Sequence, residues 1–304
     1  MKVLVAVDGS AGSKEAVRQV GQLIAPGRDA VAFYYSPPTL KFPAGATPSP
    51  ETQSQWRTKI TEAVFDDATQ LLPAAARGSV QRIVGTHAPK EGILAAAGEF
   101  SADLIAVGAR GVGLIAELLL GSVSNHIVRH AEVPVLVARA GNGTATLSKI
   151  IVACAGEGHA SLGKVVSQLT FPAGTTGKLL RVIEPMFVGQ LPDWLETMAR
   201  DADTEPMAQA WVREHEQEKQ KTATSLASAR AQYPAAFASA EPIVAEGYPA
   251  DQILKVAAQE GAQLLVMGAR RLSTMTRLIL GSTSENVLQH APCSVLIVRE
   301  RPQP

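Results

Sequence analysis

The sequence predicts an α/β protein built from two repeated open parallel-sheet domains. Short apolar runs rich in β-branched residues alternate with helical patterns along the chain, which is typical of parallel strands joined by crossover helices. The chain has 304 residues, about twice the length of a common domain. Residues 104–139 also match residues 264–299 without gaps, with fourteen identities. Together these observations indicate a duplicated domain.

The first half is expected to contain five strands and four helices. Nearly continuous apolar runs predict buried parallel strands at 2–7, 30–35, 80–84, 103–107 and 134–138. Apolar residues that recur with helical spacing predict helices near 12–25, 51–76, 90–100 and 122–130.

The second half repeats this order, with strands expected near 149–154, 178–183, 241–245, 263–267 and 294–298. Its long segment 201–233 is interpreted as the counterpart of the helix at 51–76. The charges of that segment predict a solvated helix face, with a partner-docking surface as the alternative.

Glycines and small polar residues at 141–147 predict a short linker. The expected domains are therefore 1–140 and 148–304.

Composition excludes several classes of function. The 28 lysines and arginines balance the 28 aspartates and glutamates, so no overall positive charge favours nucleic acid. No apolar run reaches the roughly 20 residues of a membrane span, and the start MKVLVAVDGS reads as a strand, not as a signal peptide. Cys154 and Cys293 each lie in an apolar run, which favours burial over a disulfide. We expect a cytoplasmic protein that binds neither nucleic acid nor membrane.

The stretch from Gly108 to Ser122 carries a candidate anion site. Gly108 ends a predicted strand, and ligands of open parallel sheets bind at that edge. Ser122 stands at the expected N-cap of the next helix, whose start favours phosphate. Glycines at 108 and 111 would let the loop approach the same anion. The alternative is that these residues only turn the chain and cap the helix. In the repeat, Ser282 and Glu285 fit a capping box, which predicts that capping alone explains that serine.

The spacing Gly108-x2-Gly111-x9-Gly121-Ser122 resembles the nucleotide-binding pattern of the universal stress protein family. The resemblance extends to the VDGS that ends the first strand, to residues 86–89 and to the closing strand after His130. It implies an adenine-nucleotide-hydrolase-like α/β fold with five parallel strands in each half, and ATP with Mg²⁺ as the ligand. It also implies that 134–138 and 294–298 pair in an intramolecular pseudo-dimer, and it allows a homodimer.

The resemblance assigns roles to individual residues. Asp8 is expected near the ribose or a phosphate-bound Mg²⁺, with Ser10 close by, and Tyr35 is expected to face the adenine. The residues expected to line the ribose and phosphates are Gly108, Gly111, Gly121, Ser122 and Val123, with Arg110 and Ser124 as phosphate neighbours. His87, matched by Gly247 in the repeat, departs from the usual pattern on the adenine side.

The second half differs where these roles matter most. Ala155 replaces Asp8, Glu157 replaces Ser10, and Arg271 replaces Gly111. Loss of the carboxylate removes an oxygen ligand suited to Mg²⁺, and Arg crowds a turn that approaches phosphate, unless its guanidinium binds the phosphate from outside.

The interpretation favoured is a nucleotide-responsive regulator without robust catalysis, whose first half binds ATP and whose second half is a degenerate partner. The alternatives are slow ATP hydrolysis or phosphoryl transfer at the same site, and a ligand-free interaction scaffold. The regulatory protein partner is not indicated.

Two weaker signals are disfavoured. Gly111, Gly113 and Ala116 fit a dinucleotide fingerprint, but they lie late in the domain and no acidic residue ends the next strand. His126 and His130 could face one way as a metal pair, yet no third ligand is near them in the sequence. His130, like His290 in the repeat, is better explained as a cap on helix carbonyls.

Overall fold

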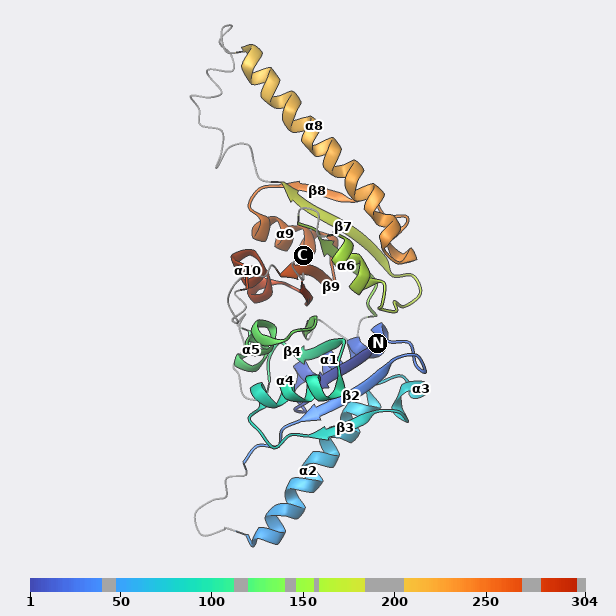
Figure 1. The fold of residues 1–304 in the computed structure, drawn as a ribbon, viewed down its shortest axis with the longest axis vertical. Coiled ribbons are helices and arrows are strands. Elements are labelled where there is room, and N and C mark those ends of the chain that lie inside the picture. The colour runs from blue at the N-terminus through green and yellow to red at the C-terminus, as the bar shows by residue number, and fades with distance from the viewer. Residues whose placement is uncertain are drawn as a thin grey trace.

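Ten strands form one continuous sheet in the computed structural model of the chain (Figure 1). The structure describes residues 1–39, 48–111, 120–139, 146–155, 159–183, 205–269 and 280–299. The elements of the first half are β1 (Lys2–Ala6), α1 (Ala11–Leu23), β2 (Ala30–Tyr35), α2 (Pro50–Gln70), α3 (Ala74–Arg77), β3 (Gln81–Val84), α4 (Pro89–Phe100), β4 (Leu104–Gly108), α5 (Ser122–His130) and β5 (Val135–Ala138).

The second half repeats this order, as the sequence predicts. Its elements are β6 (Lys149–Ala153), α6 (His159–Val166), β7 (Thr176–Ile183), α8 (Glu205–Ala229), the 3₁₀ turns η1 (Arg230–Gln232) and η2 (Ala235–Phe237), β8 (Ile243–Glu246), α9 (Pro249–Glu260), β9 (Leu264–Ala269), α10 (Ser282–His290) and β10 (Ser294–Arg299). Each half therefore contributes five strands. The domain and linker boundaries stay a prediction, because 140–145 lies outside the described residues.

The strand order explains where a ligand can bind. The sheet runs β3-β2-β1-β4-β5-β10-β9-β6-β7-β8, and the strands within each half are parallel. In the first half β1 pairs with β2 on one side and β4 on the other, so the order reverses between β1 and β4. Such a switch point opens a crevice at the carboxyl ends of the two strands. The same reversal occurs between β6 and β9.

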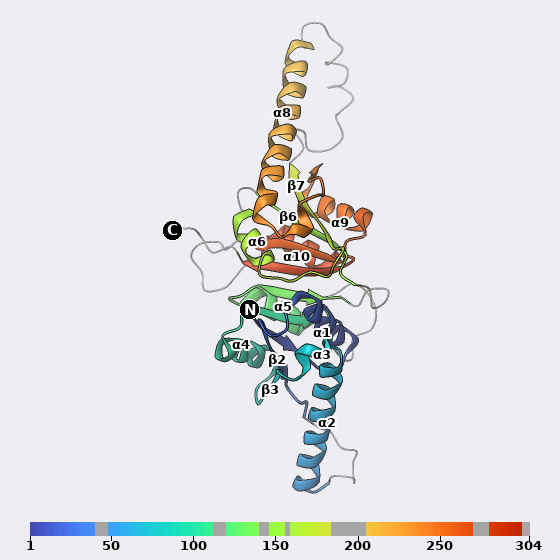
Figure 2. The same ribbon diagram turned by 90° about the vertical axis from the view of Figure 1, so that its right-hand side faces the viewer.

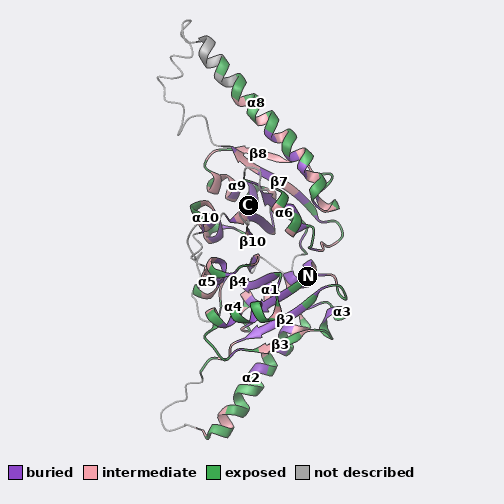
Figure 3. Ribbon diagram, in the orientation of Figure 1, coloured by how far each residue is buried: buried purple, intermediate pink, exposed green. Residues whose placement is uncertain are grey.

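Alternating side chains of each strand fill two cores, one on each face of the sheet. Val3 and Val5 of β1 pack into one core with the buried face of α1, whereas Leu4 packs into the other with residues of α4 and α5. In α1 the buried Ala16, Val17, Val20 and Leu23 recur at helical spacing, which explains why this segment is an amphipathic helix. Figure 3 shows the strands buried and the outer helix faces exposed.

The two halves meet edge to edge through their last strands. β5 and β10 pair antiparallel, with Val137 opposite Val295 and Leu136 opposite Leu296. This is the pairing that the family resemblance implies, and it covers two apolar edges that would otherwise invite aggregation. Figure 2 shows the halves on either side of this joint, with α5 and α10 beside it.

Arginines at the ends of these strands reach across the joint. Arg139, just after β5, donates from Nη2 to the carbonyls of Leu288 and Gln289 at the end of α10, at 2.6 and 3.0 Å. Arg299 of β10 donates in the same way to the carbonyl of Val128 in α5. A cation at a helix C-terminus satisfies unpaired carbonyls and favours the helix dipole. Each half thus holds a helix end of the other.

The capping box expected in the second half is wrong. The N-cap of α10 is Gly281, without a side-chain cap bond, and Ser282 is the first helical residue. Glu285 pairs with Arg129 of α5. The equivalent shift occurs in α5, where Gly121, and not Ser122, is the N-cap. The glycines have extended backbone, with ψ near 150°, and each helix begins one residue earlier than a serine N-cap predicts.

Two long helices extend away from the sheet at opposite ends of the molecule (Figure 1). The helix expected at 51–76 is observed as α2 and the short α3, because Pro73 follows the end of α2 and cannot continue the helix. The helix expected at 201–233 is observed as α8 over Glu205–Ala229. It follows β7 as α2 follows β2, which confirms their correspondence. Within the described part of the chain, no helix is both long and apolar enough to cross a membrane.

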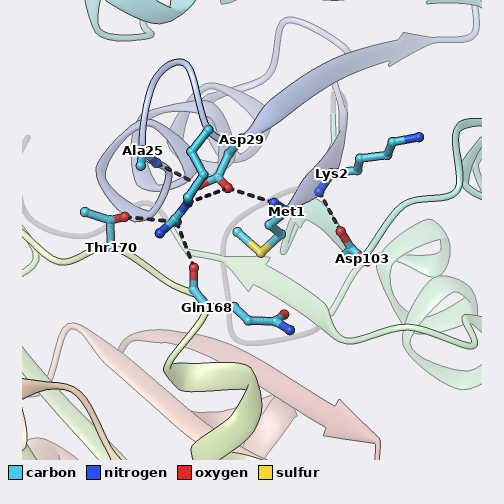
Figure 4. A network of polar contacts seen from close by, with 8 residues as sticks. Met1, Lys2, Ala25, Asp29, Asp103, Gln168 and Thr170 are labelled. Atoms are coloured by element: carbon cyan, nitrogen blue, oxygen red, sulfur yellow. Dashed lines mark hydrogen bonds and ion pairs between the residues drawn. The ribbon is translucent and has the colours of Figure 1, made fainter.

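A polar network anchors the start of β1 (Figure 4). The fully buried Asp29 side chain accepts from the Met1 amine at 2.7 Å and from the Ala25 amide at 2.8 Å. Arg28 Nη2 donates to the Asp29 carboxylate, and it also donates to the Gln168 carbonyl of the second half at 3.0 Å. Burial alone would raise the pKa of the Asp29 carboxyl, but the hydrogen bonds from Arg28, Ala25 and the amine outweigh it and hold that pKa well below its usual range.

Replacing Asp29 by Asn is expected to lower the free energy of unfolding at pH 7 by about 2 kcal/mol, because it leaves a buried amine without its counter-ion. The folded-state pKa lies below the unfolded value of about 3.9, so the stabilisation is complete above about pH 5 and is lost as pH falls from there towards the folded pKa. Urea denaturation of Asp29→Asn should therefore show a weaker pH dependence below about pH 4 than the natural chain.

Asp103→Asn is the matched control. Asp103 accepts from the Lys2 amide at 2.7 Å at an exposed position, so we expect a change below about 1 kcal/mol. Parallel loss of stability by Asp29→Asn and the natural chain between pH 5 and 2.5 would contradict the role given to Asp29.

Candidate functional site

A cavity of about 670 Å³ opens at the switch point between β1 and β4. Nine of the ten predicted site residues line it, all except Ser10. The lining is Ala6, Val7, Asp8, Ser13, Tyr34, Tyr35, Ser36, Pro38, Pro89, Ile93, Val107, Gly108, Arg110, Gly111, Gly121, Ser122, Val123 and Ser124. Its volume lies within the roughly 300–1,000 Å³ of small-molecule sites.

Asp8 supplies the carboxylate of this cavity, and Ser10 fixes its orientation. The Asp8 Oδ1 atom accepts from the Ser10 hydroxyl at 2.5 Å and from the Ser10 amide at 2.9 Å. The same Ser10 hydroxyl accepts from the Ser13 amide at 3.2 Å and so caps α1. Ser10 therefore positions Asp8 from outside the cavity lining, and the helix cap and the carboxylate are built together.

Gly108 and Gly111 allow close approach between parts of the protein itself. A Cβ at Gly108 would lie 2.4 Å from the carbonyl carbon of Gly12, because β4 crosses the start of α1 there. A Cβ at Gly111 would lie 2.7 Å from Oδ2 of Asp8. Neither residue has a positive φ. Gly108 is thus required by packing, while Gly111 opens space beside the carboxylate, and the approach of these glycines to an anion stays a prediction.

The start of α5 forms the second polar part of the cavity. The amides of the first helical turn, from Ser122 onward, have no partner within the helix, and they carry the positive end of its dipole. Ser124 has a structural role that the sequence does not reveal. Its buried hydroxyl donates to the Gly108 carbonyl at 2.6 Å and ties α5 to β4. Ser284 repeats this bond to Gly268 at 3.2 Å.

The opposite end of the cavity is aromatic and apolar. Tyr35 is buried and packs edge-to-face on Phe65, with ring centroids 6.2 Å apart. Burial and the nearby Asp8 raise the pKa of the Tyr35 phenol, with Arg57 opposing them, so it is neutral at pH 7. Sequence reasoning missed the neighbours Tyr34, Ser36, Pro38, Pro89 and Ile93. Successive residues of β2 face opposite sides of the sheet, so Tyr35 packs towards α2 and Tyr34 packs towards α4. This alternation was the signal in the sequence that could have pointed to Tyr34 and to the residues of α4.

A smaller cavity of about 390 Å³ occupies the equivalent place in the second half. Its lining includes Ala155, at the position of Asp8. The strand registers, Val5 with Phe33 and Val152 with Leu179, also place Arg181 where the first half has Tyr35. The second cavity therefore exchanges a carboxylate for a methyl group and a phenol for a guanidinium. Arg271, the counterpart of Gly111, lies outside the described residues.

His130 and His290 cap helix carbonyls. Nδ1 of His130 lies 2.8 Å from the His126 carbonyl, and Nδ1 of His290 lies 2.9 Å from that of Asn286, which confirms the capping interpretation. The His126 and His130 rings stack with centroids 4.0 Å apart. No group of three metal-binding side chains occurs among the described residues. Cys154 and Cys293 are buried and unbridged, as expected.

The fold is that of an α/β protein with a cavity at the carboxyl edge of a parallel sheet, and this arrangement occurs in both halves of the chain. The model of the universal stress protein family matches residues 1–139 and 187–299. The chain belongs to that family.

Relatives match the whole chain and its parts. A universal stress protein of Mycolicibacterium smegmatis is 26% identical over 303 residues, which is 98% of this chain and 97% of that protein. The universal stress protein YxiE of Bacillus subtilis is 47% identical over 60 residues, covering 20% of this chain and 40% of that protein. The crystal structure of a universal stress protein from Archaeoglobus fulgidus has the same fold, with a TM-score of 0.58 at 19% identity over 98% of both chains.

Proposed function

We propose that the first half binds ATP with Mg²⁺ and that the chain acts in the cytoplasm as a nucleotide-responsive stress-response regulator without robust catalysis. The observation that carries this proposal is the convergence on one cavity of about 670 Å³ of nine residues that the family resemblance predicts. Asp8 follows β1, Tyr35 ends β2, and the other seven lie between Gly108 at the end of β4 and Ser124 in α5. Membership of the universal stress protein family supports it.

The chemistry of the cavity fits a magnesium nucleotide. Asp8 offers a carboxylate oxygen, the ligand type that Mg²⁺ prefers, and the start of α5 offers amides to phosphate. Arg110 adds a cation to the lining, and the apolar end between β2 and α4 suits a planar base. We propose that the phosphates lie over Gly121 and Ser122 with Asp8 towards the metal.

The same lining argues for binding over hydrolysis. Asp8 is its single carboxylate among the described residues, and hydrolysis needs a further group that orients or deprotonates water. The second half lacks even that carboxylate. We propose that it serves as a degenerate partner in an intramolecular pseudo-dimer joined at β5 and β10, so that one chain binds one ATP.

Calorimetric titration of the full chain with Mg-ATP tests this function. We expect saturation near one equivalent per chain, strong weakening by Asp8→Ala, and no effect of Glu246→Gln, a carboxylate change on β8. Native mass spectrometry of protein purified without added ligand should detect an adenine nucleotide and report any homodimer. Two equal sites, or no affinity, would contradict the proposal. Phosphate release above background that disappears in Asp8→Ala while ATP still binds would favour the enzyme.

A further inference from the structure

α1 connects the carboxylate of the larger cavity to the second half of the chain. At the start of the helix, the Ser10 hydroxyl binds Oδ1 of Asp8 at 2.5 Å and also caps the helix. Further along the helix, Nε2 of Gln19 donates to the Ser294 hydroxyl of β10 at 2.7 Å. Gln19 is 5% exposed and Ser294 is 1% exposed, so this bond across the joint is shielded from water.

From Ser294 the contacts continue to α10, which lies across the joint from α1 (Figure 2). The Ser294 hydroxyl also accepts from the Arg139 amide at 3.0 Å, and Nη2 of Arg139 donates to the carbonyls at the end of α10. The first turn of α10 lines the smaller cavity with Ser282, Thr283 and Ser284. Side-chain hydrogen bonds between two helices therefore form a continuous path from one cavity to the other.

The charge of the larger cavity also acts on Arg139. Burial lowers the pKa of the Arg139 guanidinium, and the positive charge of Arg110 lowers it further, with Cys293 opposing them. Arg110 lines the larger cavity. A phosphate beside Arg110 would offset this repulsion and strengthen the hold of Arg139 on the carbonyls of α10.

The repeat shows that the fold does not require this path. Pro134 occupies the position of Ser294 in the alignment of the halves, and it has no hydroxyl. α6 follows β6 as α1 follows β1, and the alignment places a valine, Val165 or Val166, at the position of Gln19. The polar path thus starts from the half that has the Asp8 carboxylate and has no counterpart at these positions in the other direction.

Two atoms of the path lower the stability of the fold. Gln19 Oε1 and Arg139 Nε are buried and have no hydrogen-bond partner among the residues that the structure describes. A buried polar atom gives up its bond to water without replacement, whereas apolar side chains such as those of the repeat avoid this cost. Stability alone therefore does not explain the polar residues.

We infer that occupancy of the larger cavity is transmitted across the joint to α10 and the smaller cavity through α1, Gln19, Ser294 and Arg139. This inference rests on the proposed ATP site and adds the route by which the second half responds to it. Gln19 and Ser294 line neither cavity, so they act only through the two helices that they join. The second half then serves as the part of the chain that reads the nucleotide.

Hydrogen exchange of the full chain, with and without saturating Mg-ATP, tests the inference. In the natural chain we expect the amides of α10 to exchange about fivefold more slowly when ATP is bound, a coupling at the low end of those between distinct sites. Gln19→Leu and Ser294→Ala should each abolish this slowing. Calorimetry should show that both variants still bind ATP, because neither residue lines the larger cavity.

Gln22→Leu is the matched control. Gln22 lies on the same helix, and its Oε1 atom also accepts a bond from the second half, from the Leu147 amide at 2.7 Å. Leu147 precedes β6 and is not part of the path, so this variant should keep the slowing of α10.

Three results would overturn the inference and leave the proposed function intact. The first is ATP-dependent slowing confined to the first half of the natural chain. The second is slowing of α10 that persists in both Gln19→Leu and Ser294→Ala, because the signal would then not depend on this path. The third is equal loss of the slowing in Gln22→Leu, which would indicate a general loosening of the joint. Failure of the natural chain to bind ATP would reject the proposed function, and this inference with it.

Discussion

Replacing Gly111 by Arg is expected to weaken Mg-ATP binding by at least about 100-fold, which corresponds to roughly 2.7 kcal/mol or more. A Cβ at position 111 would lie 2.7 Å from Oδ2 of Asp8, so any side chain presses on the proposed metal ligand. The guanidinium would in addition pair with the Asp8 carboxylate and occupy the oxygens meant for Mg²⁺. This substitution gives the first half the residue that the repeat carries at 271.

Titration calorimetry measures this loss, and Gly78→Arg controls for the added charge. Gly78 is an exposed residue of the same half, and a Cβ there would meet nothing within 4 Å. We expect the control to bind ATP like the natural chain. The thermal midpoint of Gly111→Arg should change little, because Gly111 is itself exposed. ATP affinity within threefold of the natural value would show that the middle glycine is not required for the site.

The second large effect concerns stability. Gly108→Ala is expected to lower the free energy of unfolding by about 3 kcal/mol, at the upper end of overpacking effects. The new Cβ would lie 2.4 Å from the carbonyl carbon of Gly12 and 2.7 Å from the Ser13 amide nitrogen. Both are backbone atoms at the start of α1, which cannot turn away as a side chain can. The strand and helix must therefore separate.

Urea denaturation checks this value, with Gly281→Ala as the control. Gly281 also borders a cavity at a strand-to-helix junction, but a Cβ there would meet nothing within 4 Å and its φ is −61°. We expect a change below about 1 kcal/mol. A similar loss of stability in both variants would show that backbone freedom, and not the crossing of β4 over α1, determines the need for glycine.

The repeat made much of the fold predictable from the sequence. Apolar runs and helical spacing located the strands and main helices, because burial on both faces of a parallel sheet leaves a continuous apolar pattern. The family resemblance predicted that Asp8, Tyr35 and the glycines share one site, and the structure places them around one cavity. The joint between β5 and β10 was implied by the family resemblance, and it covers two apolar edges.

The differences arose where the deciding partner is distant in the sequence. Local spacing matched Ser282 and Glu285 to a capping box, whereas the partner of Glu285 is Arg129 in the other half. The bond from the Ser124 hydroxyl to the Gly108 carbonyl was not foreseen, and the role of Ser124 beside a phosphate stays a prediction. The need for glycine at position 12 was not predicted, because it comes from the close approach of Gly108 in β4 and of Arg110 just after it. Tyr34 was missed because its hydroxyl lies between Gly85, just after β3, and Gly92 of α4, which no local pattern connects.

The crossed arginine contacts at the joint mean that each half supports the cavity of the other half. Arg299 holds the far end of α5, whose first turn borders the larger cavity, and Arg139 does the same for α10 and the smaller one. Each of the two unlike cavities is thereby supported by the half that differs from it, and because both halves belong to one chain, the cavities occur in a fixed ratio. Separate single-domain chains would assort into like and unlike pairs, whereas covalent fusion guarantees the mixed pair in every molecule.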